Sequence, residues 1–173
     1  MRARCLLCVA LLLIVPGASA TAAGMGGVGV GAQYYDAGLS SANNALTYIT
    51  GFGYATSGRP EAARIGGFGM AILSTTGMVD GGVGGMLVGR EVRSGPLVSA
   101  VTAYLGTGGV SFRSGGYMVV FGELEVEIGV RFMGMQLSPY AGFQAWGNLI
   151  PGTPLAEALV YTPVLGVRMA WGG

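Results

Sequence analysis

Several residue types that carry much of protein chemistry are absent or scarce in this chain of 173 residues. It has no His, all nine of its basic residues are Arg, and only 10% of its residues are charged. Without His, a Ser-His-Asp triad and a His-ligated zinc site are excluded. A formal net charge of +1, with no cluster of basic residues, predicts no nucleic-acid partner. We therefore expect no catalytic residues, no metal site and no cofactor.

Cysteine is nearly absent as well, and both cysteines lie in an N-terminal segment that resembles a signal peptide. Arg2 and Arg4 precede an apolar core over residues 5–15, and Ala18-Ser19-Ala20 is the small-x-small pattern that signal peptidase cleaves. We expect residues 1–20 to be removed, which leaves residues 21–173 as one exported domain with a net charge of −1. That domain has no cysteine, so disulfides cannot stabilise it. A lipid anchor is not expected, since neither cysteine lies at the cleavage point.

The exported part also lacks an uninterrupted apolar run long enough for a transmembrane helix. Instead, runs of about ten residues with period-two alternation recur between polar or Gly/Pro breaks, which is typical of β-strands. We count eight such runs, at residues 26–35, 45–55, 62–73, 81–92, 97–105, 116–134, 140–149 and 159–171. If Gly122-Glu123 is a turn, residues 115–134 form two strands and the count becomes nine.

The residues that we assign to the apolar face of each run include no charged residue, while the other face is mostly Gly, Ala, Ser, Thr, Gln and Asn. In a membrane the charge-free face is expected to contact lipid and the small, polar face to line a confined interior. In the second, third and fourth runs the predicted lipid face consists of Leu46, Tyr48, Phe52, Tyr54, Phe68, Met70, Ile72, Val83 and Leu87.

The breaks after odd-numbered runs are longer than those after even-numbered runs. We expect longer external loops near residues 36–44, 74–80, 106–115 and 150–158, and short turns at the other end.

With these features the exported part resembles the small eight-stranded outer-membrane β-barrel proteins of bacteria. The resemblance is one of architecture and rests on no diagnostic motif. It implies an all-β fold, a transmembrane antiparallel up-and-down barrel, in which every backbone polar group finds a partner. It also implies contact with outer-membrane lipid and recognition of the last strand, residues 159–171, by the barrel-assembly machinery.

Aromatic residues fall near the ends of the predicted strands, on the parity assigned to lipid. They predict two girdles, one at each membrane interface. The girdle residues are Tyr34, Tyr48 and Tyr161 at the outer level, and Tyr54, Phe132 and Trp171 at the periplasmic level.

The few charged residues of the strands are expected to pair inside the barrel, because an eight-stranded barrel is only wide enough for side chains to fill. The predicted lumen network comprises Glu125, Glu127, Arg131, Arg168 and Arg90. Arg64 does not fit this network, since it shares its parity with Phe68 and Met70. We interpret it as an interfacial residue, or as the sign of a bulge at Gly66-Gly67.

The predicted function is non-catalytic: a structural or surface-interaction barrel with a plugged lumen. One alternative is a narrow channel or transporter for small apolar solutes. Others are a soluble exported β-protein and a helical membrane hairpin, because Gly77, Gly81, Gly85 and Gly89 follow a glycine-zipper spacing. A paired-carboxylate site at Glu123, Glu125 and Glu127 has the right residue type but no evident cleft.

Overall fold

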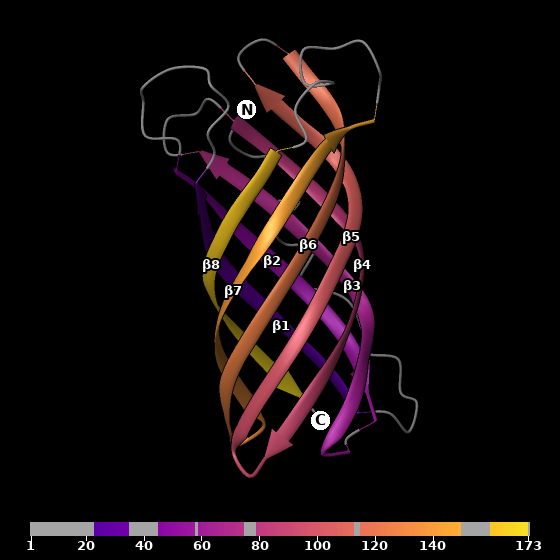
Figure 1. Cartoon of the computed structure of the whole chain (residues 1–173), viewed down its shortest axis with the longest axis vertical. Coiled ribbons are helices and arrows are strands. Elements are labelled where there is room, and N and C mark those ends of the chain that lie inside the picture. The colour runs from indigo at the N-terminus through magenta and orange to yellow at the C-terminus, as the bar shows by residue number, and fades with distance from the viewer. Residues whose placement is uncertain are drawn as a thin grey trace.

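The computed structural model describes residues 23–34, 45–57, 59–74, 79–112, 115–149 and 160–172. These residues form eight antiparallel strands that run obliquely around one long axis (Figure 1). The strands are β1 (Ala23–Tyr34), β2 (Ala45–Thr56), β3 (Glu61–Ser74), β4 (Val79–Ser94), β5 (Leu97–Phe112), β6 (Gly115–Phe132), β7 (Met135–Asn148) and β8 (Val160–Gly172). The predicted signal peptide, residues 1–20, lies outside the described residues.

Each strand pairs with its neighbours in the sequence, and β8 pairs with β1, so the sheet closes into a barrel. At the seam, Met25 lies opposite Gly172 and Gln33 lies opposite Val164. Closure leaves no strand edge without a partner, which a sheet needs if it is surrounded by lipid. The predicted fold class, an all-β barrel of eight antiparallel strands, is confirmed.

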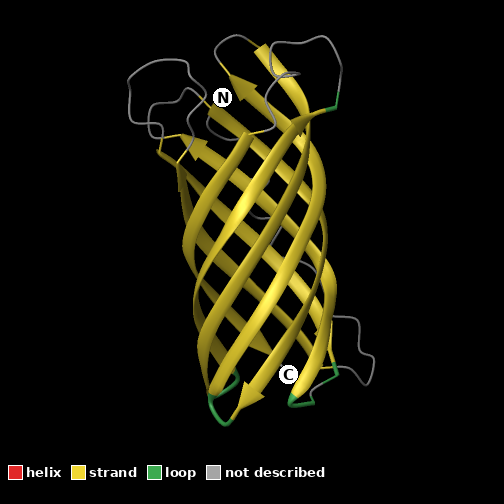
Figure 2. Ribbon diagram, in the orientation of Figure 1, coloured by secondary structure: helices red, strands yellow, loops and turns green. Residues whose placement is uncertain are grey.

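The β4–β5 and β6–β7 turns lie at one end, here called the short-turn end, where they are green in Figure 2. Gly95-Pro96 joins β4 to β5, and Gly95 has φ 58°, as the first position of a type II′ turn requires. Met133-Gly134 joins β6 to β7 with φ of 49° and 77°, the sign pattern of a type I′ turn. The C-terminal strand β8 also ends here, beside the β6–β7 turn, where the Gly172 amide donates to the Gly134 carbonyl over 3.1 Å.

The opposite end, here called the loop end, carries the connections that include residues 35–44, 75–78, 113–114 and 150–159, which lie outside the described residues. The predicted external loop at 106–115 is wrong over most of its length. β5 continues to Phe112 because its Gly-rich end pairs with the start of β6, with Gly106 opposite Phe121.

Two further boundaries differ from the prediction. Residues 134–139 were expected to be a turn, but β7 begins at Met135, since Gln136 and Ser138 turn their polar side chains into the lumen. Residues 115–132 form one continuous strand, so the nine-stranded alternative is wrong and Glu123 lies mid-strand.

The outer surface of the barrel is apolar over most of its height. Large side chains such as Leu105, Leu124, Ile128, Phe143 and Leu165 are each more than half exposed. An apolar belt on a closed barrel is the surface that a bilayer covers.

The helical alternative is wrong for residues 61–74 and 79–94, which are strands β3 and β4. In the described part of the chain no helix has the length and apolar character needed to cross a membrane.

Candidate functional site: the filled lumen

The interior of the barrel holds a network of buried charges centred on Arg168 of β8. Its side chain binds Glu125 with both terminal nitrogens; Nη1 contacts Oε1, and Nη2 lies 2.9 Å from Oε2. Nη1 also lies 3.0 Å from Oε2 of Glu127. The guanidinium stands 4.7 Å from the ring centres of Phe52 and Tyr140. Two carboxylates and two aromatic faces therefore compensate a charge that is 5% exposed.

A second arginine, Arg64 of β3, extends the network toward the short-turn end. Its Nε donates to Glu91 over 2.8 Å, and its Nη1 lies 2.5 Å from Oε1 of Glu127. Glu127 thus bridges Arg64 and Arg168. Arg93 pairs with the other oxygen of Glu91. The result is one continuous chain of alternating charge along the lumen.

Neutral donors complete the coordination of these carboxylates. The Tyr104 hydroxyl donates to Glu125 over 2.6 Å, Gln136 donates to Glu127 over 3.2 Å, and Thr56 donates to Glu91 over 3.0 Å. Buried carboxylates need such donors because Coulomb attraction alone rarely repays their desolvation.

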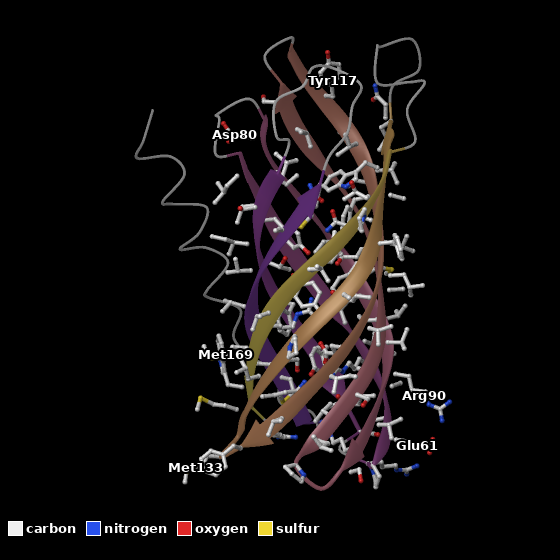
Figure 3. All side chains as sticks on the ribbon, turned by 60° about the vertical axis from the view of Figure 1, so that its left-hand side comes forward. Glu61, Asp80, Arg90, Tyr117, Met133 and Met169 are labelled. Carbon is white, nitrogen blue, oxygen red and sulfur yellow. The ribbon has the colours of Figure 1, made fainter. Side chains whose placement is uncertain are left out.

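The five predicted lumen residues lie in three different places. Glu125, Glu127 and Arg168 lie together in the network. Arg131 lies half-buried at the short-turn end, where its Nη2 donates to the Gly172 carbonyl over 2.7 Å. The prediction for Arg90 is wrong: its side chain is on the outer surface, 71% exposed, and pairs with Glu61 (Figure 3).

The prediction missed Arg64, Glu91 and Arg93 because it reversed the facing of β2, β3 and β4. Arg64 needs no bulge, since β3 pairs without interruption on both sides of Gly66-Gly67. It faces the lumen together with Phe68 and Met70, which are also buried. The sequence signal for this orientation was the charged residue Arg64 on the same face of β3 as Phe68 and Met70.

Toward the loop end, the lumen is filled by aromatic rings rather than charges. Phe121 is completely buried and packs against Trp146, with ring centres 4.7 Å apart. Phe68 lies 5.7 Å from Phe121 and meets Tyr104 edge-on at 5.2 Å. These contacts fill this part of the interior with aromatic side chains, as is expected of a narrow barrel.

Glu123 lies beside this aromatic layer, next to Gln144. Gln144 donates to Glu123 over 2.9 Å and accepts from the Trp146 indole over 3.2 Å. The row Glu123, Glu125 and Glu127 thus contacts side chains from four other strands, β3, β5, β7 and β8.

The large lumen side chains fit because glycines face them. A Cβ at Gly31 of β1 would come within 2.6 Å of the Tyr140 hydroxyl, and a Cβ at Gly27 within 2.5 Å of the Phe52 ring. Tyr140 donates in turn to the Tyr48 hydroxyl over 3.0 Å. The small residues on the lumen face of β1 thus leave space for the large side chains on the lumen face of β2.

This complementarity corrects the prediction for two of the six girdle residues. Tyr48 and Tyr54 point inward and are 1% and 7% exposed, because β2 supplies bulk to the lumen. Phe132 and Trp171 lie on the outer surface near the short-turn end, 66% and 44% exposed. The side chains of Tyr34 and Tyr161 lie outside the described residues.

The described residues hold no group of three or more His, Cys, Asp or Glu arranged to bind a metal ion. Instead, each carboxylate of the charge network accepts from arginines and neutral donors. The arrangement is suited to holding β3, β4, β6 and β8 together across the barrel interior.

No family model matches this chain, and no curated protein matches it in sequence. Among solved structures it is similar to Ail, the attachment invasion locus protein of Yersinia pestis, with a TM-score of 0.51 and 9% sequence identity. The similarity covers 88% of this chain and 99% of the Ail chain, so it extends over the whole barrel. The resemblance to small outer-membrane barrels is therefore confirmed as one of architecture.

Proposed function

We propose that the protein is a non-catalytic barrel of the bacterial outer membrane, exported by the signal peptide at residues 1–20. Its role is structural or one of surface interaction, and its lumen is closed by the Glu–Arg network. The observation that carries the proposal is the combination of an apolar outer belt with a filled interior.

Four features support this assignment. The exposed apolar side chains match a lipid surrounding, and the shared architecture with Ail extends over nearly the whole chain. Arg168 and Arg64 cross-link β3, β4, β6 and β8 at buried sites, which leaves little room for a solute path. The carboxylates of Glu91, Glu125 and Glu127 are engaged by arginines, which argues against a general acid or base among these three.

The contact surface in this proposal is the loop end, where the connections near residues 36–44, 74–80 and 150–158 would face the exterior. The partners are outer-membrane lipid, the barrel-assembly machinery acting on residues 159–171, and no nucleic acid. In β8, Leu165, Val167, Met169 and Trp171 alternate outward, the pattern expected of a terminal strand that this machinery recognises.

The test is fractionation of cells that express the full chain, followed by gel electrophoresis with and without heating. We expect the protein in the outer-membrane fraction, with the mass of residues 21–173 and faster migration before heating than after it. Recovery in the soluble fraction, or migration that heating does not change, would overturn the assignment.

The second candidate function is a channel, in which a solute would pass along the lumen of the barrel. It requires that the aromatic layer at Phe121 and Trp146 and the network at Arg168 move apart. It predicts discrete conductance steps from the wild-type protein in planar bilayers, whereas the plugged barrel predicts none.

A further inference from the structure

The seam between β1 and β8, indigo and yellow in Figure 1, is the shortest strand pairing among the described residues. β8 lies opposite residues 25–33 of β1, whereas β5 lies opposite the whole of residues 79–94 of β4. Toward the loop end the described register of the seam stops at Val164. The next residue of β8, Pro163, has no amide hydrogen to donate to a ladder. The seam therefore has fewer backbone hydrogen bonds to break than the other pairings.

The charge network of the lumen also bypasses β1. This strand contains no charged residue, so none of the ion pairs in the described lumen includes it. Its neighbour β8 is held differently, because Arg168 binds carboxylates of β6. Gln33 of β1 is buried, but its Oε1 has no hydrogen-bond partner. At the seam, β1 is thus held mainly by its backbone.

Side chains interlock little where β1 faces the lumen. Its inward positions between Met25 and Gln33 are Gly27, Gly29 and Gly31, and the rings of β2 and β7 pack against their bare backbone. Glycine weakens a strand interior, since it has no side chain to pack. Segments with few interlocked side chains and few hydrogen bonds open at a lower free energy than the rest of a fold.

From these observations we propose that the barrel opens laterally at the β1–β8 seam, with β1 still paired to β2. The opening uncovers the lumen side chains of β2 next to β1, such as Tyr48 and Thr50, from the side of the barrel. Arg64 and Arg168 keep their carboxylates, because those ion pairs join β3, β4, β6 and β8. The inference goes beyond the proposed function, since the lumen remains plugged along its axis while its wall opens sideways.

Thiol labelling of a lumen residue beside the seam tests the opening. Thr50 is buried on β2 opposite Gly29, and the control Thr102 is buried on β5 opposite Glu125. Both native cysteines precede residue 21, so an introduced cysteine reports alone after export. We expect N-ethylmaleimide to label Thr50→Cys several-fold faster than Thr102→Cys in lipid vesicles. No labelling of Thr50→Cys on the time scale of the experiment would overturn the proposal.

A disulfide across the seam decides whether labelling depends on its opening. Val30 and Val167 lie opposite each other across the seam and are about half exposed, as are Val101 and Val126 across β5 and β6. Oxidised Val30→Cys with Val167→Cys should slow the labelling of Thr50→Cys several-fold. Oxidised Val101→Cys with Val126→Cys should leave it unchanged. Equal labelling rates with the two disulfides contradict the lateral opening.

Amide hydrogen exchange of the wild-type protein tests the same opening without cysteines. Measured by mass spectrometry in lipid vesicles, residues 27–33 of β1 should exchange several-fold faster than residues 99–105 of β5. Equal protection of the two segments would refute a seam that opens before the rest of the barrel.

Gel migration with and without heating, measured on the same samples, separates two kinds of failure. If heating leaves the migration of the wild-type protein unchanged, the membrane-barrel assignment itself fails. If heating changes migration but the seam disulfide changes nothing, the barrel assignment stands and only the lateral opening is refuted.

Discussion

Replacing Arg168 by Met is expected to destabilise the barrel far more than the same change at Arg90. Met retains much of the bulk of Arg and removes its charge. The decrease in the free energy of unfolding therefore reports mainly on the ion pairs. After Arg168→Met, Glu127 keeps Arg64 at 2.5 Å, whereas Glu125 keeps only the Tyr104 hydroxyl at 2.6 Å. One buried carboxylate is thus left without a cation.

Removing one partner of a buried pair costs about 3–5 kcal/mol, and the remaining partners place this variant near the lower end, at about 3 kcal/mol. At roughly 1.4 kcal/mol per factor of ten, the folded-to-unfolded ratio should fall about a hundredfold. Arg90→Met removes a pair that is mostly exposed, which contributes about 0–1 kcal/mol.

The assay is equilibrium unfolding by guanidinium in lipid vesicles, followed by the fluorescence of Trp146 and Trp171. The double variant Glu125→Gln with Arg168→Met should cost less than the sum of the two single changes, because it removes the uncompensated carboxylate. A loss for Arg168→Met no larger than that for Arg90→Met, or strict additivity in the double variant, would refute the network as a source of stability.

Three further substitutions follow from the packing, each measured by the same unfolding assay. Phe121→Ala should cost about 3–5 kcal/mol, since it empties the centre of the aromatic layer, and should exceed Phe143→Ala on the lipid-facing surface. Gly31→Ala should cost about 1–3 kcal/mol because its methyl group collides with two tyrosines, whereas Gly53→Ala should be tolerated. Met133→Asn should stabilise the barrel by about 1 kcal/mol, since Asn adopts a φ of 49° more readily than Met.

The architecture was predictable from the sequence because period-two alternation and turn residues are local signals. The eight runs correspond to the eight strands, and the facing of β1 and of β5 to β8 was predicted correctly. In β6 the alternation of Glu125 and Glu127 with Val126 leaves one possible orientation in lipid. The pairing of Arg168 with those carboxylates follows from parity and from the need to compensate buried charge.

The facing of β2, β3 and β4 was not predictable from hydrophobicity, because in a narrow barrel both faces are apolar. The lumen of such a barrel must be filled, so Tyr48 and Phe68 pack inward while glycines remain outside. Charge alone did not decide the facing either, because Arg64 and Glu91 lie on the inward parity of β3 and β4, whereas Glu61 and Arg90 lie on the outward parity of the same strands. The extent of β5 beyond residue 105 was missed because glycines were read as a loop, whereas pairing with β6 keeps them in the sheet.

The most direct test of a closed lumen is single-channel recording of the purified wild-type protein in planar lipid bilayers. The filled interior predicts no discrete conductance steps at moderate voltage. In the same recordings, the double variant Arg64→Ala with Arg168→Ala should show steps, if it still folds by the heat-modifiability criterion. Stable wild-type channels whose conductance these substitutions leave unchanged would contradict the Glu–Arg network as the element that closes the barrel.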